Sequence, residues 1–265
     1  MIFLRNILFI STVIWFGCDA VEEFLPTNPY DPLNDDYVKP EVNFTSVPNE
    51  GATISTSNIT FGWEGNEEGM FYRYAFDEVW TIWEENKAAT ISHIDEGSHS
   101  IAIQSKYPTG DTSQVKTVAF IVDAVQGPSI IFFPRKHKAF TGENISFQII
   151  AEEVNGLAAA SFKLNYNTSL VQIDSIVVGD YIGDNVESIF YKEIDNASGK
   201  ASVITALLGS NSPVFSGTAS IAKLYAKVKS TGISQIQFDG TETYRNLNNE
   251  LITINSAIGG IIDQQ

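Results

Sequence analysis

Apolar and polar residues alternate with a period of two along most of the chain after Glu41, and no convincing stripe of apolar residues at helical spacing occurs there. Phe162, Leu164 and Tyr166 are a clear example, because a polar residue separates each from the next. Successive side chains of a β-strand point to opposite faces of a sheet, so this pattern predicts strands with one buried and one solvent-facing side. Glycine, asparagine, aspartate and proline separate the short segments, as is typical of β-sandwiches and barrels. The sequence therefore predicts an all-β fold.

Residues 41–125 hold the first run of alternating segments. The expected strands are Val42–Val47, Ile59–Trp63, Phe71–Phe76, His99–Gln104 and Val115–Val122. The aromatic and glycine motifs that follow one another are Phe61-Gly-Trp63, Tyr72-Arg-Tyr74-Ala-Phe76, Trp80-Thr-Ile-Trp83 and Gly97-Ser-His99. This order resembles the immunoglobulin-like, fibronectin-III-like modules of bacterial surface proteins, and about seven strands in this length suit such a sandwich. We therefore expect an immunoglobulin-like β-sandwich over residues 41–125.

The aromatic residues of this module fall into two groups. Tyr72, Tyr74 and Phe76 share one face of a strand and are expected to form its core side. Trp80 and Trp83 leave two interpretations open. Either they pack in the core or at an edge, or they form a platform on which sugar rings stack. The second interpretation gives the chain an alternative function, the capture of a polysaccharide at a cell surface.

Residues 129–263 carry a second ordered set of motifs, which follows the linker Val125–Ser129. The set comprises Phe140-Thr-Gly142-Glu143, Ile145–Ile149, Ala160–Asn167, Val178-Gly179-Asp180, Ser198-Gly199-Lys200, Ser216-Gly217-Thr218 with Ala219–Val228, Ile236–Phe238 and Gly259-Gly260. This set resembles the cohesin domain over its whole length. The resemblance implies a nine-stranded jelly-roll β-sandwich. The complete fold prediction is therefore an immunoglobulin-like sandwich followed by a cohesin-like one.

The resemblance to cohesins also implies a protein partner. Cohesins of cellulosomes bind dockerins, which are small calcium-loaded helical modules, through a flat sheet face that includes the strand found here at 160–166. Ser161, Lys163 and Asn165 lie on the solvent side of that strand and are partner-binding candidates. Dockerin-binding cohesins carry an asparagine and an aspartate where this chain has Ala159 and Ser161. Two polar contacts of about 1.5–3 kcal/mol each are thus missing, and the expected partner is a dockerin-bearing or another surface protein.

A small strip of positive charge is the second group of partner-binding candidates. Lys223, Tyr225 and Lys227 alternate with alanine and leucine residues, so they are expected to point outward from one strand. The alternative is an ordinary solvated face whose lysines discourage pairing between sheet edges.

The first residues predict export from the cytoplasm. Met1–Gly17 contains Arg5 and then an apolar run, Ile7–Phe16, that is too short to cross a bilayer core, which takes ~20 helical residues. Cys18, the only cysteine, follows directly behind Gly17. This arrangement resembles the bacterial lipoprotein signal, which implies lipid attachment at Cys18 and an extracytoplasmic, lipid-anchored place in the cell envelope. The alternative is a plain signal peptide followed by an incidental cysteine.

Residues 18–40 form the predicted connection between the lipid and the folded part. This segment contains Pro26, Pro29, Pro32 and Pro40, and its acidic residues outnumber its single lysine. Prolines remove ladder donors and like charges repel, so we expect an extended acidic tether. The alternative is that part of it packs on the first domain as an edge strand, which Phe24, Leu25 and Tyr30 leave open.

Composition removes several classes of function. The chain has 265 residues, 16 Lys and Arg against 32 Asp and Glu, and a formal net charge of −16. Such a surface repels phosphate backbones, so nucleic acid is not an expected partner. The single cysteine excludes an internal disulfide, and His93, His99 and His137 are not paired at metal-ligand spacing. No metal or other cofactor is expected.

The acidic residues do not by themselves predict an enzyme. Asp180, Asp184 and Glu187, and the pair Glu152 and Glu153, lie close in sequence, but glycosidase chemistry needs two carboxylates at a fixed separation across a cleft. We interpret them as solvated loop residues. Asp239, Glu242, Asn246 and Asn248 offer oxygen ligands for calcium without the dense loop of a calcium motif. The leading hypothesis is therefore a non-catalytic cell-envelope lipoprotein that binds a protein partner.

Overall fold

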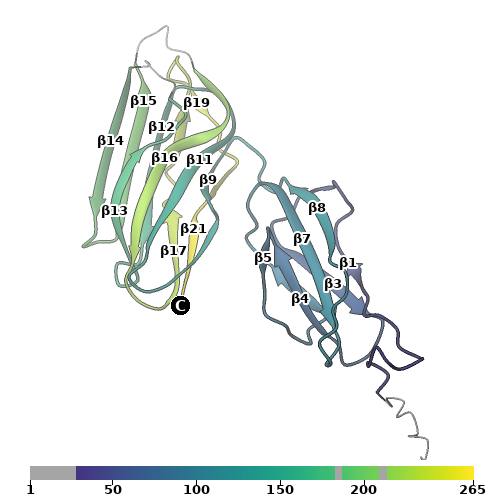
Figure 1. Ribbon diagram of the computed structural model, residues 1–265. Coiled ribbons are helices and arrows are strands. Elements are labelled where there is room, and N and C mark those ends of the chain that lie inside the picture. Colours follow the sequence, from purple (N-terminus) through teal and green to yellow (C-terminus); the bar gives the residue numbers. More distant parts are fainter. Residues whose placement is uncertain (1–27, 183–186, 209–213) are drawn as a thin grey trace, which may run out of the picture.

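The computed structural model describes residues 28–182, 187–208 and 214–265, and strands are its regular elements there (Figure 1). The all-β prediction is confirmed. Two hydrophobic cores occur, one built from residues between 42 and 122 and the other from residues between 130 and 262. None of the described residues belongs to a helix long and apolar enough to cross a membrane. The predicted signal segment, Cys18 and Asp184 lie outside the described residues.

Two sheets enclose the N-terminal core. The strands are β1 (Val42–Ser46), β2 (Thr53–Ile54), β3 (Ile59–Gly65), β4 (Phe71–Phe76), β5 (Val79–Trp80), β6 (Ala88–Ile91), β7 (Gly97–Lys106) and β8 (Lys116–Val122). One sheet has the order β1-β3-β6 and the other β2-β8-β7-β4-β5. Tyr72 is buried in the core, and Tyr74 and Phe76 pack against it. The inward face predicted for β4 is confirmed.

Residues 28–40, the second part of the predicted tether, pack on this domain. They form successive turns closed by backbone hydrogen bonds, such as Tyr37 N–H to the Asn34 carbonyl at 3.0 Å. Tyr30 and Tyr37 contact the ring of Tyr107, with centroids 4.7 and 6.3 Å away. The Tyr107 hydroxyl donates to the Val38 carbonyl at 2.9 Å. Within this part, the segment packs on the domain because its aromatic side chains find a buried partner, but it does so through turns and not as an edge strand.

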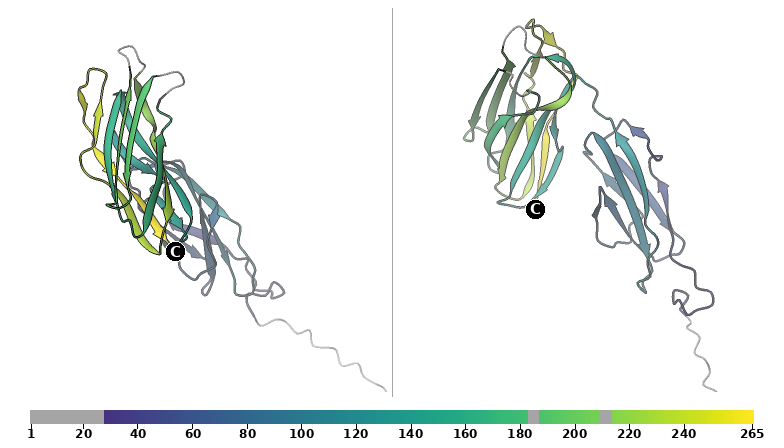
Figure 2. Two further views of the ribbon diagram at one scale, coloured as in Figure 1. Left: turned by 90° about the vertical axis from the view of Figure 1, so that its left-hand side faces the viewer. Right: turned by 45° about the horizontal axis from the view of Figure 1, so that its top comes forward.

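The C-terminal domain consists of two sheets that lie face to face (Figure 2). Its strands are β9 (Ser129–Phe133), β10 (Lys136–Ala139), β11 (Asn144–Leu157), β12 (Ala159–Tyr166), β13 (Val171–Val178), β14 (Ser188–Asp195), β15 (Lys200–Leu207), β16 (Phe215–Val228), β17 (Gly232–Phe238), β18 (Thr243–Arg245), β19 (Leu251–Ile252), β20 (Ser256–Ile258) and β21 (Gly260–Gln264). The five-stranded sheet has the order β13-β16-β11-β9-β20. The eight-stranded sheet runs β10-β21-β17-β12-β15-β14, and β18 and β19 extend it beside β12.

The side chains between these two sheets are the apolar half of each alternating strand. Phe162 and Leu164 on β12 are buried, as are Leu224 and Val228 on β16. One pair of polar side chains in the core forms a mutual hydrogen bond. The Tyr181 hydroxyl and the Thr205 hydroxyl lie 2.6 Å apart, and burial raises the pKa of Tyr181. The sandwich is therefore filled, and its outer faces remain available.

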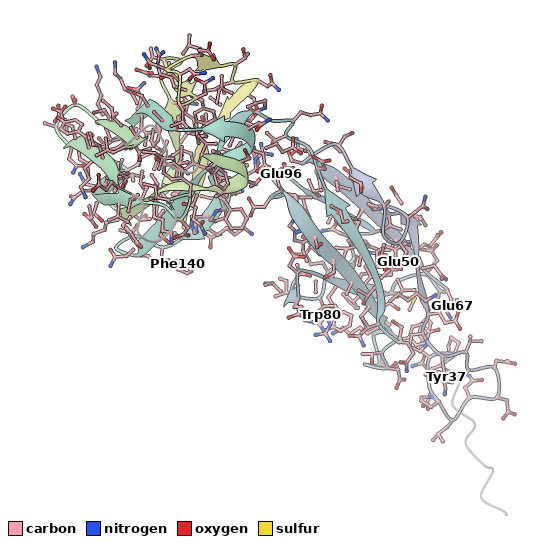
Figure 3. All side chains as sticks on the ribbon, turned by 90° about the horizontal axis from the view of Figure 1, so that it is seen from above. Tyr37, Glu50, Glu67, Trp80, Glu96 and Phe140 are labelled. Atoms are coloured by element: carbon pink, nitrogen blue, oxygen red, sulfur yellow. The ribbon has the colours of Figure 1, made fainter. Side chains whose placement is uncertain are left out.

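Backbone and carboxylate groups join the two domains. The Arg135 N–H donates to Asp95 Oδ1 at 2.6 Å, across the junction. Glu96 Oε2 accepts from the Ala124 N–H at 2.8 Å at the start of the linker. Figure 3 shows Glu96 where the two domains meet. Burial is the main cause that raises the pKa of both Asp95 and Glu96, and hydrogen bonds from backbone N–H groups offset part of it.

These two carboxyl groups predict a pH dependence. Their pKa values in the folded chain lie above the ordinary 3.8 and 4.5. Between the ordinary and the raised pKa values, the folded chain therefore binds more protons at Asp95 and Glu96 than the unfolded chain does. The free energy of unfolding decreases as pH rises through this interval, because the folded state loses those protons. Thermal unfolding from pH 4 to pH 7 should show a smaller loss of stability in Asp95→Asn with Glu96→Gln than in the parent chain. Equal losses in both proteins would contradict the assignment.

Candidate functional site

The outer side of the eight-stranded sheet is the candidate site of the C-terminal domain. Strands β14, β15, β12 and β17 lie next to one another, and their outward side chains form what we call the binding face. The strand register places Ser161 opposite Ile204 and Ile204 opposite Tyr191. Because the pairing is antiparallel and directly opposed, each such row of side chains points to the same side of the sheet. The next residues along each strand, such as Phe162 and Val203, point into the core.

One end of the binding face is apolar. Ile189, Tyr191 and Ile204 are exposed there. Tyr191 is 52% exposed, although aromatic residues mostly bury their area in a stable sheet. Ala159 and Ser161 border this group on β12. The end of the binding face next to Ala159 and Ser161 therefore presents apolar side chains.

The other end of the binding face is charged and hollowed. A recess of about 450 Å³ is lined by side chains that include Lys163, Asn165, Glu193, Asp195, Lys200 and Asp239. Asp195 Oδ2 accepts from the Ser198 hydroxyl at 2.6 Å, and Oδ1 accepts from two backbone N–H groups of the same turn. These bonds favour the charged carboxylate and hold the pKa of Asp195 below its ordinary value. The recess thus offers fixed charges of both signs.

The two groups of predicted partner-binding residues lie on opposite sides of the sandwich. Ser161, Lys163 and Asn165 point outward from β12 on the binding face, as predicted from their spacing. Lys223, Tyr225 and Lys227 lie on β16 in the other sheet. One flat partner surface cannot contact both groups. Lys223 is moreover engaged with Asp180, whose Oδ1 lies 2.8 Å from its Nζ.

Sequence reasoning missed Ile189, Tyr191 and Ile204. The alternation in 188–195 and 200–207 could have indicated them, because it divides the side chains of each strand into two sets that point to opposite faces of the sheet. It did not show which set faces solvent, since both sets contain apolar residues. The β14–β15–β12 register resolves this by joining Tyr191 and Ile204 to Ser161.

The oxygen ligands considered for calcium belong to separate turns. Asp239 Oδ1 accepts from the Thr241 N–H at 3.0 Å. Asn246 Oδ1 accepts from the Asn248 N–H at 2.9 Å and from the Glu250 N–H at 3.0 Å. These oxygens close the turns in which they lie. Within the described ranges, no group of three or more His, Cys, Asp or Glu side chains is arranged to hold a metal ion.

Trp80 and Trp83 lie in the N-terminal domain, at and just after the edge strand β5. The guanidinium of Arg73 lies over both rings, with its Cζ 4.6 Å from the Trp80 centroid and 4.7 Å from the Trp83 centroid. Neither tryptophan belongs to the buried core. The structure therefore places them on the surface and in contact with a cation.

Comparisons with known proteins concern the C-terminal domain. The model of the cohesin domain family matches residues 132–261, which lie within the predicted 129–263. No curated protein matches the chain. A non-cellulosomal cohesin from the archaeon Archaeoglobus fulgidus is similar, with 16% identity and a TM-score of 0.43 over 52% of this chain and 90% of that one.

Two bacterial structures are similar to the same degree. A type II cohesin from the cellulosome of Acetivibrio cellulolyticus has 16% identity and a TM-score of 0.45, and covers 51% of this chain and 94% of that one. A type I cohesin–dockerin complex from Clostridium thermocellum gives 17% identity and a TM-score of 0.46, over 52% of this chain and 98% of that one. Residues 132–261 of this chain form a cohesin domain, which is a protein-binding module.

Proposed function

We propose that the chain is a non-catalytic lipoprotein of the cell envelope whose cohesin domain binds a dockerin-like protein through the binding face. The exposed apolar group Ile189, Tyr191 and Ile204 beside a charged recess is the observation that carries this proposal. Protein interfaces commonly combine a central aromatic or aliphatic anchor with a polar rim. A solved type I cohesin from Clostridium thermocellum is in complex with a dockerin, which supports this class of partner.

The distribution of side chains on the binding face defines the partner further. Ala159 and Ser161 offer little to a charged partner residue, while Tyr191 and Ile204 next to them offer apolar area. The partner therefore presents an apolar side chain at this end. At the other end, Glu193, Asp195 and Asp239 face Lys163 and Lys200 in the recess, which favours a partner with side chains of both charges.

Replacing Tyr191 with alanine tests this assignment. A buried interface tyrosine is a typical hot spot, so we expect binding to weaken by about 30-fold, the equivalent of about 2 kcal/mol. The measurement is a calorimetric titration of the full chain with a panel of purified, calcium-loaded dockerin modules. Tyr225→Ala is the matched control, because Tyr225 is 43% exposed on the opposite sheet.

The control also separates the two sides of the sandwich. Unchanged binding in Tyr225→Ala supports the binding face. A loss in Tyr225→Ala without a loss in Tyr191→Ala would transfer the interface to the β16 strip. If no dockerin module binds at micromolar concentration, the dockerin-like partner is rejected, although the cohesin fold stands. The membrane anchor is tested separately, by incorporation of a fatty-acid analogue that Cys18→Ser should abolish.

A further inference from the structure

A row of alternating aromatic rings and cations lies on the outer side of the sheet β2-β8-β7-β4-β5, over β7, β4 and β5. Arg73 lies over Trp80 and Trp83, and the Lys106 Nζ lies 4.7 Å from the Trp83 centroid and 5.6 Å from that of Phe71. Figure 3 shows Trp80 at the side of the N-terminal domain, away from its core. We call Trp80, Arg73, Trp83, Lys106 and Phe71 the aromatic–cation row.

The position of this row follows from the alternation in β4. Tyr72 and Tyr74 point into the core, so Phe71 and Arg73 point outward. Antiparallel pairing sets Gln104 opposite Arg73 and Lys106 opposite Phe71 on β7. Gln104 Oε1 accepts from Arg73 Nε at 3.0 Å and from Nη2 at 2.7 Å. The guanidinium is thus held in place between the tryptophans before any ligand arrives.

Neither cation of the row is neutralised by a carboxylate. Among the described residues, the ion pairs within 4.0 Å involve three other lysines and one histidine, and Arg73 and Lys106 take no part in them. A guanidinium has five N–H donors, and the Gln104 contacts leave several of them free. The row therefore retains unsatisfied positive charge.

The row is accessible at Trp80 and half-buried at Phe71, Arg73, Trp83 and Lys106. Trp80 is 38% exposed, and its neighbours Val79 and Ile82 on and beside the edge strand are largely exposed. Indole faces pack against the apolar faces of pyranose rings, and guanidinium and ammonium groups bind carboxylate and sulfate groups. A neutral sugar uses only the rings, whereas an acidic sugar uses the rings and both cations.

We propose that the aromatic–cation row binds an acidic polysaccharide, in which sugar rings contact Trp80 and Trp83 and acidic groups contact Arg73 and Lys106. This site is independent of the cohesin domain and of its partner. The alternation of rings and charges suits a polymer whose acidic groups recur along an extended chain. The formal net charge of −16 opposes every polyanion, so binding depends on the local contacts with the rings and the two cations of the row.

Titration of the full chain with polygalacturonate, a uronic-acid polymer, tests the proposal, with neutral dextran alongside. We expect binding to polygalacturonate that weakens with added salt, and at least tenfold weaker binding to dextran. Arg73→Gln and Lys106→Gln should each reduce the affinity for polygalacturonate about tenfold, since each removes one charged contact. Trp80→Ala should reduce it to a similar degree.

Lys116→Gln is the matched control for charge. Lys116 lies on β8 of the same sheet, but its Nζ donates to Asn43 Oδ1 and takes no part in the row. Its replacement should leave the affinity unchanged, and so should Tyr191→Ala in the cohesin domain. An equal loss of affinity in Lys116→Gln would show that the effect comes from the overall charge of the protein and not from the row, and it would overturn the proposal. The absence of binding, equal binding of dextran, or capture of a protein by this row in place of the polymer would overturn it as well.

Discussion

Replacing Phe162 with alanine is expected to lower the free energy of unfolding of the cohesin domain by about 3–5 kcal/mol. Phe162 is 1% exposed on β12, and its ring meets the Phe238 ring edge to face with a centroid distance of 5.8 Å. Truncation removes buried apolar area and leaves a cavity that the two packed sheets cannot close. The binding face lies on the same strand, so partner binding should decrease in proportion to the unfolded fraction.

The tryptophans make this measurement selective. All four lie at positions 15, 63, 80 and 83, outside the cohesin domain. Tryptophan fluorescence therefore follows the N-terminal domain, and circular dichroism follows both domains. In denaturant, Phe162→Ala should shift the cohesin transition and leave the fluorescence transition in place. Lys163→Ala, the next residue on the opposite face, should change stability by no more than about 0.5 kcal/mol. Equal effects at 162 and 163 would refute the assigned orientation of β12.

Gly199→Ala is expected to destabilise the cohesin domain by at least about 3 kcal/mol, through strain and not through a cavity. Gly199 has a φ of +72°, which costs an alanine about 1–2 kcal/mol. An added Cβ would also lie 2.2 Å from the Tyr166 carbonyl oxygen, and the Tyr166 N–H donates to the Gly199 carbonyl at 2.9 Å. The alanine must therefore displace the backbone of β12 from the β14–β15 turn.

Gly142 provides the control for this experiment. It has a φ of +89°, and a Cβ built on it meets no atom within 4 Å. Gly142→Ala should therefore cost only the conformational strain, about 1–2 kcal/mol. The difference between the two variants in the free energy of unfolding, obtained by chemical denaturation, gives the cost of the contact between the added Cβ at position 199 and the Tyr166 carbonyl oxygen. Similar losses of stability in both variants would show that the backbone shifts to remove this contact at no measurable cost, which would contradict the prediction.

The turn at Gly199 also connects stability to the binding face. Asp195 and Lys200, which flank this turn, line the charged recess. A variant that moves the turn should alter the recess even when the domain remains folded. Binding lost in Gly199→Ala and retained in Gly142→Ala, both measured well below their melting temperatures, would be consistent with the position proposed for the partner.

The N-terminal domain shows which side chains the local alternation of apolar and polar residues could place and which it could not. The alternation in 71–76 predicted that Tyr72, Tyr74 and Phe76 form the core side, and the structure confirms it. The residues between them received no role in the sequence analysis, yet Arg73 is the centre of the aromatic–cation row. Its partners Gln104 and Trp83 come from other segments, and only the pairing of β4 with β7 and the chain after β5 brings them to it.

The sequence by itself determined the all-β class, the approximate strands and the buried side of strands such as β12, because alternation with a period of two is a local property of the chain. The tertiary structure alone decided which outward residues share a surface. It joined Ser161 to Ile204 and Tyr191, and it placed Tyr225 on the opposite sheet. The register between strands distant in sequence depends on how the two sheets pack, and no local pattern contains that information.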